Sequence, residues 1–368
     1  MFWGSSYTTK QLPSLEGKVF LITGANSGIG EVSARMFALA GASKIYLACR
    51  SESRVREALD RIRAWLADAK QWKHCAPASV TPAGVDVDAI MSRLVWLPLD
   101  LTSLKSVKEA AETFKAKESR LDCLLNNAGV MAMPLSYTQD GLEMQVGTNV
   151  VGHYLLTMLL MPVLADTARL PEYADTGKTV RVVQVSSTGH TLLAKRHIEG
   201  GWKDLEAVNR TYRPEALGTW LRYAKSKTGN ILLANRVKAL AEANQLSISS
   251  ASIHPGVVRS NLVSGLSLSY GSIFGTLFTT IIYPFQLTAE AGALTQIYAC
   301  ASTEFDERKE NGSYFVPSAR VGRAAWYARD ESGEAGKDLD AFVEAFVKQK
   351  VGVDFRQVLR EEGRLSNL

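Results

Sequence analysis

Three glycines near the start of the chain follow a short apolar run and precede a helical pattern. Residues Val19 to Ile22 are all apolar, and Gly24, Gly28 and Gly30 end that run before apolar residues recur at helical spacing. Glycine allows a sharp backbone turn and leaves no side chain in the path of a bulky anion. N–H groups at a helix start carry partial positive charge and hold phosphate oxygens. The stretch therefore predicts a dinucleotide site, and the plainer alternative is a glycine turn that binds nothing.

A second set of residues, Tyr223 and Lys227, suits proton transfer. The two lie four positions apart in a stretch with helical spacing, so they share one face of the predicted helix. A free phenol has a pKa of about 10, too high for a good base near neutral pH, and a neighbouring ammonium group lowers that pKa. Taken alone, the pair is more typical of an amphipathic helix whose lysine stem lies along apolar surface.

The second predicted strand, Lys44 to Cys49, ends at a cation. Arg50 follows it directly, and Arg54 and Arg56 come soon after. In a doubly wound α/β fold the adenosine ribose lies at this strand end, where an acidic residue would hold the free 2′-hydroxyl of NAD. A guanidinium group instead suits the 2′-phosphate of NADP. Arg50 therefore favours NADP(H), and a solvated arginine at a helix start is the alternative.

Polar residues also follow the later strands. Asp100 suits either a hydrogen bond from the adenine amine or the capping of the next helix. Small side chains in Asn126–Gly129 let the chain pass close to a ligand, and asparagine amides tie neighbouring strands together. Asn149 lies in an apolar helical pattern, so its amide either kinks that helix or holds a water. His153 is more typical of a core histidine with satisfied hydrogen bonds than of a catalyst.

Composition narrows the function further. The formal net charge is +5 over 368 residues, with Lys and Arg scattered, which argues against a nucleic-acid partner. None of the four cysteines forms a Cys-x-x-Cys pair and the five histidines show no metal-ligand spacing, so we expect inert thiols and no metal. Residues 1–10 show no secretory signal pattern. These features predict a reducing, cytoplasmic location.

Strand and helix patterns alternate along the chain, which predicts one α/β domain built on a doubly wound parallel sheet with helices on both faces, a Rossmann fold. The predicted strands are 19–22, 44–49, 94–99, 121–125, 179–185, 248–253 and 314–317. Four segments stand outside the alternation, namely a surface loop at 70–92, an insertion beside the site at 188–218, a cover at 262–290 and a C-terminal extension at 330–368.

The core of the predicted cover, residues 265–287, is aromatic and apolar. It is broken by Gly271, Gly275 and Pro284 and contains several serines and threonines, which argues against a helix that spans a membrane. Its composition suits a cover over an apolar substrate pocket, and a shallow contact with a membrane is the second interpretation.

Taken in order, these motifs resemble the short-chain dehydrogenase/reductase family, and the strand end Ala48–Arg50 is most similar to its retinol-dehydrogenase-like branch. The resemblance is close over residues 17–260 and rests on Thr23–Gly30, Asp100–Leu101, Asn126–Gly129, Asn149, Ser186–Ser187, Tyr223-x-x-x-Lys227 and Pro255–Gly256. It implies that Tyr223 transfers a proton, Lys227 binds the nicotinamide ribose and lowers the pKa of Tyr223, Ser187 hydrogen-bonds the substrate oxygen and Asn149 positions a water.

The resemblance also implies a set of residues that bind the cofactor. These are Gly24, Asn26, Ser27, Gly28, Ile29, Gly30, Arg50, Asp100, Leu101, Asn127, Ala128, Gly129, Tyr223, Lys227, Pro255, Gly256, Val258 and Ser260. Two departures concern the substrate side of the site. The stretch between Ser187 and Tyr223 is longer than is usual in the family, and Ser260 stands where threonine is usual.

The function that this resemblance implies is an NADP(H)-dependent ketone or aldehyde reductase, or the reverse alcohol dehydrogenase. We expect an apolar or aromatic small-molecule substrate, such as a secondary metabolite, and a homodimer is possible for such a protein. A dehydratase, isomerase or cyclase that uses the same site is one alternative. A non-catalytic protein that senses NADP is another, although it would not need Asn149, Ser187, Tyr223 and Lys227 together.

Overall fold

The computed structural model of the chain describes residues 7–80, 84–193, 201–259, 286–362 and 365–367. Eight strands form one sheet in the order β3-β2-β1-β4-β5-β6-β7-β8, and every neighbouring pair is parallel except β7 and β8. The strands are β1 (Val19–Thr23), β2 (Lys44–Cys49), β3 (Leu94–Pro98), β4 (Cys123–Asn126), β5 (Val180–Val185), β6 (Ile248–Ile253), β7 (Tyr314–Val316) and β8 (Arg320–Gly322). The predicted fold class, a doubly wound parallel sheet, is confirmed.

The central strands are buried because helices cover the sheet on both sides. Every residue of β1, β4, β5 and β6 is buried, including the polar residues Arg181 and Gln184 of β5 and three serines of β6. The short edge strand β8 was not predicted. It pairs antiparallel with β7, and both Arg320 and Val321 in it are exposed, so it carries no apolar run to mark it.

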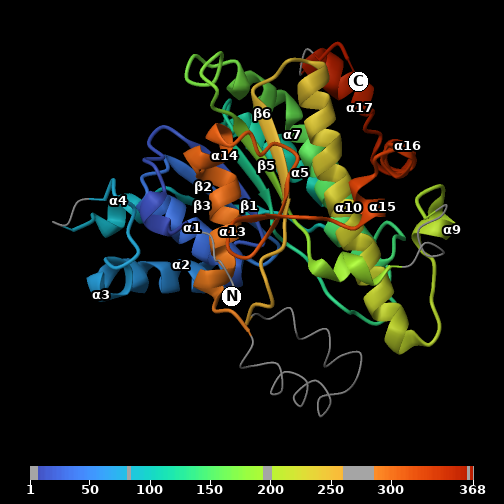
Figure 1. Cartoon of the computed structure of the whole chain (residues 1–368), viewed down its shortest axis with the longest axis horizontal. Helices are drawn as coiled ribbons and strands as arrows, with labels where there is room; N and C mark the ends of the chain where they lie inside the picture. Colours follow the sequence, from blue (N-terminus) through green and yellow to red (C-terminus); the bar gives the residue numbers. More distant parts are fainter. Residues whose placement is uncertain (1–6, 81–83, 194–200, 260–285, 363–364, 368) are drawn as a thin grey trace.

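Two layers of helices enclose the sheet (Figure 1). One layer packs a core that includes Phe20, Ile22 and Leu47, and its helices are α1 (Gly28–Leu39), α2 (Glu52–Ala67) and α13 (Ala289–Ala301). The other layer packs Leu21 and Leu124, and its helices are α5 (Leu104–Lys117), α7 (Gly152–Ala168), α10 (Glu215–Ala243) and α16 (Glu334–Val351).

Short helical elements join these layers. They are η1 (Thr9–Gln11), α3 (Ala69–Trp72), α4 (Val87–Met91), α6 (Met144–Val146), η2 (Gly147–Val151), η3 (Thr188–Leu192), α9 (Leu205–Val208), α14 (Thr303–Glu307), α15 (Trp326–Arg329), α17 (Phe355–Gln357) and η6 (Val358–Glu362). The segment predicted as a surface loop, 70–92, thus holds most of α3 and all of α4. The segment 188–218 holds η3 and α9, and most of the cover at 262–290 lies outside the described residues.

One stretch, Met144–Ala168, is long and apolar enough to cross a membrane by length and composition. Its most apolar part is entirely buried, and the stretch consists of α6, η2 and α7, with Asp166 exposed near its end. Its apolar character therefore follows from its central place in the helix layer, where nearly all of its surface is covered.

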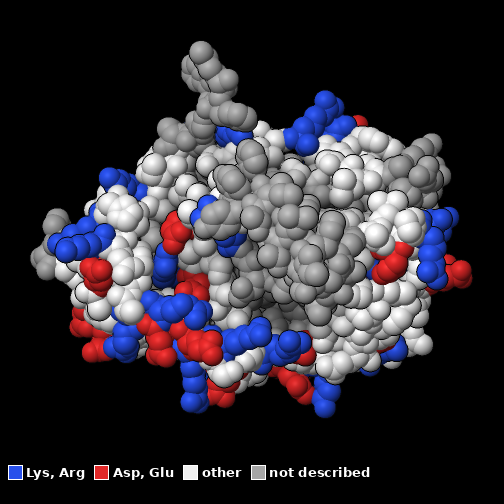
Figure 2. All heavy atoms as spheres, turned by 90° about the horizontal axis from the view of Figure 1, so that it is seen from below, with Lys and Arg blue, Asp and Glu red and all other residues white. Residues whose placement is uncertain are grey.

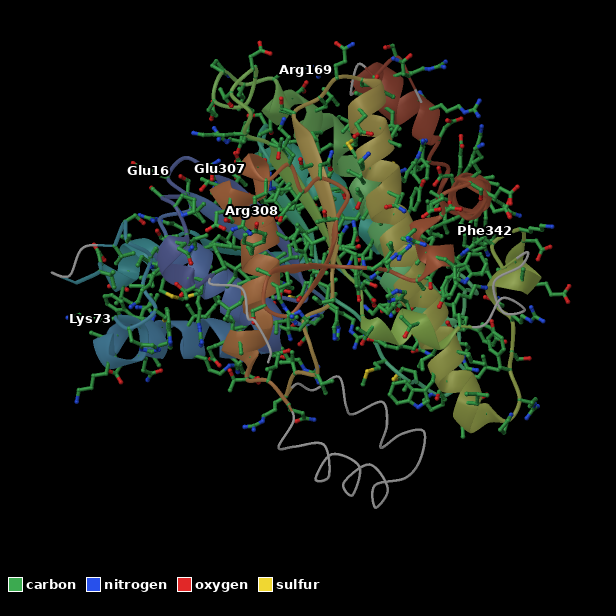
Figure 3. The ribbon with its side chains drawn as sticks, viewed as in Figure 1. Glu16, Lys73, Arg169, Glu307, Arg308 and Phe342 are labelled. Atoms are coloured by element: carbon green, nitrogen blue, oxygen red, sulfur yellow. The ribbon has the colours of Figure 1, made fainter. Side chains whose placement is uncertain are left out.

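The order of the strands indicates at which edge of the sheet a ligand would bind. The order reverses between β1 and β4, and ligands of open α/β sheets bind beyond the carboxyl ends of the strands at such a point. In Figure 1 this carboxyl edge is the lower one. Glu16, Arg169, Glu307 and Arg308 lie at the opposite, upper edge in Figure 3. On the face shown in Figure 2, positive and negative side chains are mixed along one rim.

We expect the last long helix, α16, to contribute to stability through one buried leucine. Leu339 on α16 is completely buried against the core that α5, α7 and α10 share. We expect Leu339→Ala to lower the free energy of unfolding by about 2–5 kcal/mol, because it leaves a cavity. Gln349 is exposed on the same helix, so Gln349→Ala is the control. It should change the free energy of unfolding by less than about 0.5 kcal/mol. Urea unfolding measures both, and equal effects would show that α16 does not contribute to the core.

Candidate active site

The glycine turn joins β1 to α1 at the carboxyl edge. Gly24 and Gly28 have φ values of +68° and +58°, a region that other residues rarely adopt. A Cβ atom at Gly24 would lie 3.0 Å from Ala128, and one at Gly30 would lie 2.6 Å from Asn127 Nδ2. The predicted glycines therefore also let the turn after β4 pack directly against the turn after β1.

The Thr23 hydroxyl holds these two turns together. Its oxygen accepts hydrogen bonds from the backbone N–H groups of Asn127 and Ala128, both at 2.9 Å. Because both lone pairs are then used, its proton must be donated to His153 Nε2, which lies 2.8 Å away. His153 is therefore the Nδ1–H tautomer, and it donates to the backbone oxygen of Asn149 at 3.0 Å. The prediction that His153 is a satisfied core histidine is confirmed.

Asn149 lies in the π turn η2, in the middle of the buried helical stretch. Its Nδ2 donates to Val130 O and to Ser226 Oγ, both at 2.9 Å, and its Oδ1 accepts from Val130 N at 2.8 Å. The two amide hydrogens thus tie the chain after β4 to α10. Of the two roles predicted for Asn149, the structural one is present, and a water held by this residue stays a prediction.

Helix α10 is tied to the end of β5 by several hydrogen bonds. Val185 O accepts from Lys227 Nζ and from Asn230 Nδ2, both at 2.9 Å, and Ser186 Oγ donates to Lys227 O at 2.7 Å. The Lys227 Nζ atom lies 5.6 Å from the ring centre of Tyr223. The structure therefore brings the predicted pair onto the buried side of α10, at the carboxyl edge.

Ser187 and Gly129 lie against the same pair. A hydrogen bond joins the side chains of Ser187 and Tyr223. A Cβ atom at Gly129 would lie 3.1 Å from Asn149 Oδ1 and 3.4 Å from Lys227 Nζ. Asn149 and Lys227 thus meet beside Gly129, and Ser187 meets Tyr223, whose ring centre lies 5.6 Å from Lys227 Nζ.

Burial governs the protonation of Tyr223 and Lys227. It raises the pKa of Tyr223 to about 12, and the hydrogen bond with Ser187 lowers that pKa only in part. Burial also lowers the pKa of Lys227 to about 7, because desolvation disfavours its ammonium form. A lowering of the Tyr223 pKa by Lys227 together with an oxidised nicotinamide stays a prediction.

The predicted adenosine region lies beyond β2 and β3. Arg50 is exposed directly after β2. Asp100 Oδ1 accepts from the backbone N–H and the hydroxyl of Thr102, while Ser103 caps α5, so Asp100 is not the helix cap. Leu101 is buried beside it.

Arg61 was missed by the sequence analysis. Its Nη2 donates to Asn26 O at 3.0 Å and to Glu31 Oε2 at 2.8 Å, so it holds the glycine turn from the side of α2. Its position in the middle of a charged amphipathic helix gave no signal that distinguished it from solvated arginines.

The chain after β6 completes the edge. Gly256 has a φ of +92°, and a Cβ atom there would lie 2.5 Å from Leu287. Val258 pairs with Leu287 in a parallel bridge, and its side chain is so close to Gly292 of α13 that a Cβ atom there would lie 2.4 Å away. Pro255 is thus followed by a fixed turn, and Ser260 lies outside the described residues.

The residues present fit a nicotinamide dinucleotide. The side chain of Ser27 accepts no capping hydrogen bond at the start of α1, which leaves N–H groups of that first turn for a phosphate. The same turn carries Asn26, Gly28, Ile29 and Gly30, and the glycines keep its surface free of side chains. Among the described residues, no group of three His, Cys, Asp or Glu side chains is arranged to hold a metal ion.

Comparison with known proteins decides the family. The family model described as short chain dehydrogenase matches residues 85–192. Retinol dehydrogenase 12 of Homo sapiens is 36% identical over 319 residues, which cover 86% of this chain and 82% of that protein. The chain belongs to the short-chain dehydrogenase/reductase family. A short-chain dehydrogenase/reductase of Armillaria gallica is 34% identical over 345 residues, 93% of this chain and 94% of its own.

A solved structure shares the fold of this short-chain dehydrogenase/reductase. NADPH-bound carbonyl reductase from chicken fatty liver superposes with a TM-score of 0.52 at 20% identity, covering 84% of this chain and 100% of that one. The chain is therefore an oxidoreductase of a family that binds a nicotinamide cofactor. The predicted family, including its likeness to retinol dehydrogenases, is confirmed.

Two buried histidines predict how stability depends on pH. Burial lowers the pKa of His153 and of His254 to about 4, whereas an unfolded histidine has a pKa of about 6.5. Below that value the unfolded chain binds protons that the folded protein does not, so the free energy of unfolding falls as the pH drops from about 6.5 towards 4. We expect a loss of about 1–3 kcal/mol per histidine, measured by urea unfolding across this range.

A substitution at His254 tests whether this histidine causes part of the fall in stability at low pH. His254→Gln removes one of these groups, to which the buried His190 with its lowered pKa adds a third, and should flatten the fall in stability by the share of His254. The exposed His74→Gln should leave the fall unchanged. The explanation fails if both variants lose stability with acid as the unmodified protein does.

Proposed function

We propose that this protein uses NADPH to reduce a ketone or aldehyde group on an apolar or aromatic small molecule, and that it catalyses the reverse alcohol oxidation. One observation carries the proposal. The hydroxyl of Ser187 is hydrogen-bonded to the phenol of Tyr223, with Lys227 one helical turn along, at the strand edge that also carries the glycine turn. These groups would bind the oxygen of a carbonyl and give it a proton.

The protonation state of Tyr223 supports reduction. With a pKa raised to about 12, the phenol keeps its proton at neutral pH and is ready to act as the acid. Ser187 would donate a hydrogen bond to the same carbonyl oxygen, which withdraws electron density from the carbon. NADPH, when bound, supplies the hydride for that carbon. Lys227 would hold the ribose with the ammonium hydrogens that its bond to Val185 leaves over.

The cofactor preference rests on the cation after β2. Arg50 is exposed, and among the ion pairs of the described residues none includes it, whereas Arg61 is paired with Glu31. A guanidinium group without a carboxylate partner suits a 2′-phosphate. The carbonyl reductase from chicken fatty liver, which shares the fold, was solved with NADPH bound, and this supports the same preference.

The substrate class rests on the surroundings of α10. A small buried apolar cluster packs on α10 and includes Leu193, Tyr212, Leu221, Ala224 and Tyr314, of which Tyr314 interacts with Tyr223. Retinol, the alcohol in the name of the human relative, is itself largely apolar. Together they support an apolar or aromatic substrate.

Tyr223 tests the proposed chemistry. Purified protein should consume NADPH with at least one member of a panel of apolar ketones and aldehydes, and the product should gain two hydrogens by mass spectrometry. Tyr223→Phe removes only the phenolic oxygen and should lower kcat by roughly 10²- to 10⁴-fold. The exposed Tyr137→Phe is the control and should keep full activity. A fully active Tyr223→Phe variant, or an isomerised product without added hydrogens, would refute the proposal.

Arg50 tests the cofactor preference. Arg50→Asp should raise the KM for NADPH by about 10- to 100-fold, because it replaces a charge-assisted hydrogen bond by repulsion, and should leave the KM for NADH similar or lower. Lys73→Asp makes the same change of charge at a distant corner of the molecule (Figure 3) and should alter neither value. An unchanged KM for NADPH in Arg50→Asp would show that this residue does not read the 2′-phosphate.

A further inference from the structure

His190 is buried three residues after Ser187 and is bonded through both ring nitrogens. Its Nδ1 lies 2.6 Å from the backbone oxygen of Ser187, and its Nε2 lies 3.0 Å from the backbone nitrogen of Ala325. A carbonyl can only accept and an amide N–H can only donate. The two partners therefore fix the neutral tautomer that carries its proton on Nδ1 and donates it to Ser187.

Ala325 reaches this position from the far end of the chain, between β8 and α15. The same segment makes a second bond, from the Tyr327 hydroxyl to the backbone oxygen of His190. The imidazole also packs edge-on against Tyr314 of β7, with ring centres 5.2 Å apart. The element η3, which begins directly after Ser187, is thus fixed to residues 314–327 on three sides.

This attachment matters for Ser187 because the loop lies directly on the phenol. Ser187 Oγ accepts from Gly189 N at 3.0 Å, so the hydroxyl is oriented by its own loop. A Cβ atom at Gly189 would lie 3.0 Å from the ring of Tyr223. A small shift of residues 187–190 would therefore change the distance between the Ser187 hydroxyl and the phenolic oxygen.

We propose that His190 is a positioning residue for the reaction: together with the N–H of Ala325 it holds Ser187 in the place from which that serine binds the substrate oxygen. This inference rests on the proposed function. His190 acts through Ser187 and not on the reacting atoms, since its two nitrogens are used by backbone groups. The lowered pKa of His190, caused by burial, agrees with a neutral ring that accepts from Ala325.

Position 325 allows one of the two bonds to be removed without changing the ring. The φ of Ala325 is −56°, which proline adopts without backbone strain, so Ala325→Pro deletes the N–H donor, and the proline ring also displaces the imidazole from its place 3.0 Å from that nitrogen. His190→Phe removes both bonds and keeps a ring against Tyr314. His190→Asn retains an N–H near the position of Nδ1 and serves as the conservative variant.

The test is a double-mutant cycle with Ser187→Ala, measured with NADPH and a carbonyl substrate. We expect Ala325→Pro and His190→Phe to lower kcat about 5- to 30-fold, with the KM for NADPH unchanged and part of kcat restored in His190→Asn. In the Ser187→Ala background neither change should lower kcat further, because the group that they position is gone. Thermal unfolding of each variant shows that the protein is folded.

Two results would contradict the inference, and they differ from a failure of the proposed function. The first result is that His190→Phe and Ala325→Pro lower kcat by the same factor with and without Ser187, or that they lower kcat in neither background. In either case His190 is only part of the core. If Ser187→Ala itself keeps full kcat, the proposed role of Ser187 fails first, and the inference fails with it.

Discussion

The hydroxyl of Thr23 is the interaction on which the ligand edge of this protein depends. One buried oxygen accepts from the turn after β4 and donates to His153, which in turn holds the carbonyl of Asn149 in the π turn. Three elements that are distant in the sequence are thereby fixed at the reversal of strand order. Without that oxygen, the N–H of Ala128 and an imidazole nitrogen would be left unpaired in the interior, at a cost of about 1–3 kcal/mol each.

The second half of the site depends in the same way on backbone atoms at the end of β5. The carbonyl of Val185 accepts from Lys227 and Asn230, and the carbonyl of Ser187 accepts from His190. Side chains of α10 and η3 are thus positioned by the strand itself, the most rigid part of the fold. Burial disfavours the charged forms of the surrounding groups: the pKa of Tyr223 is raised, and those of Lys227 and the histidines are lowered. A proton donor that is fixed and neutral at rest suits carbonyl reduction.

The sequence predicted those features that short-range patterns determine. Short segments rich in apolar residues gave most of the seven parallel strands, because most residues of a buried strand in a parallel sheet are apolar, although β6 is half serine. Spacing gave the glycine turn and placed Tyr223 beside Lys227, because a turn and a helix face are local. The strand β8 escaped prediction because its few residues are largely exposed, and the π turn at Asn149 escaped because no residue type marks it.

Contacts between residues far apart in the chain could not be predicted from the sequence, for a different reason. The contact between His190 and Ala325 joins residues 135 positions apart and uses a backbone N–H that any residue except proline provides. Arg61 looks like its solvated neighbours until the turn at Asn26 is placed beside it. The burial that raises the pKa of Tyr223 depends on the whole fold and could not be seen from its neighbours in the helix.

The structure of the protein in complex with NADPH tests the central claim most directly, namely that this edge is a preformed nicotinamide site served by a buried phenol. The account predicts the pyrophosphate on the first N–H groups of α1, the 2′-phosphate beside Arg50 and the nicotinamide ring next to Tyr223 and Ser187, with the Thr23 hydrogen bonds unchanged. A dinucleotide bound elsewhere, or a nicotinamide ring held away from the phenolic oxygen, would contradict it.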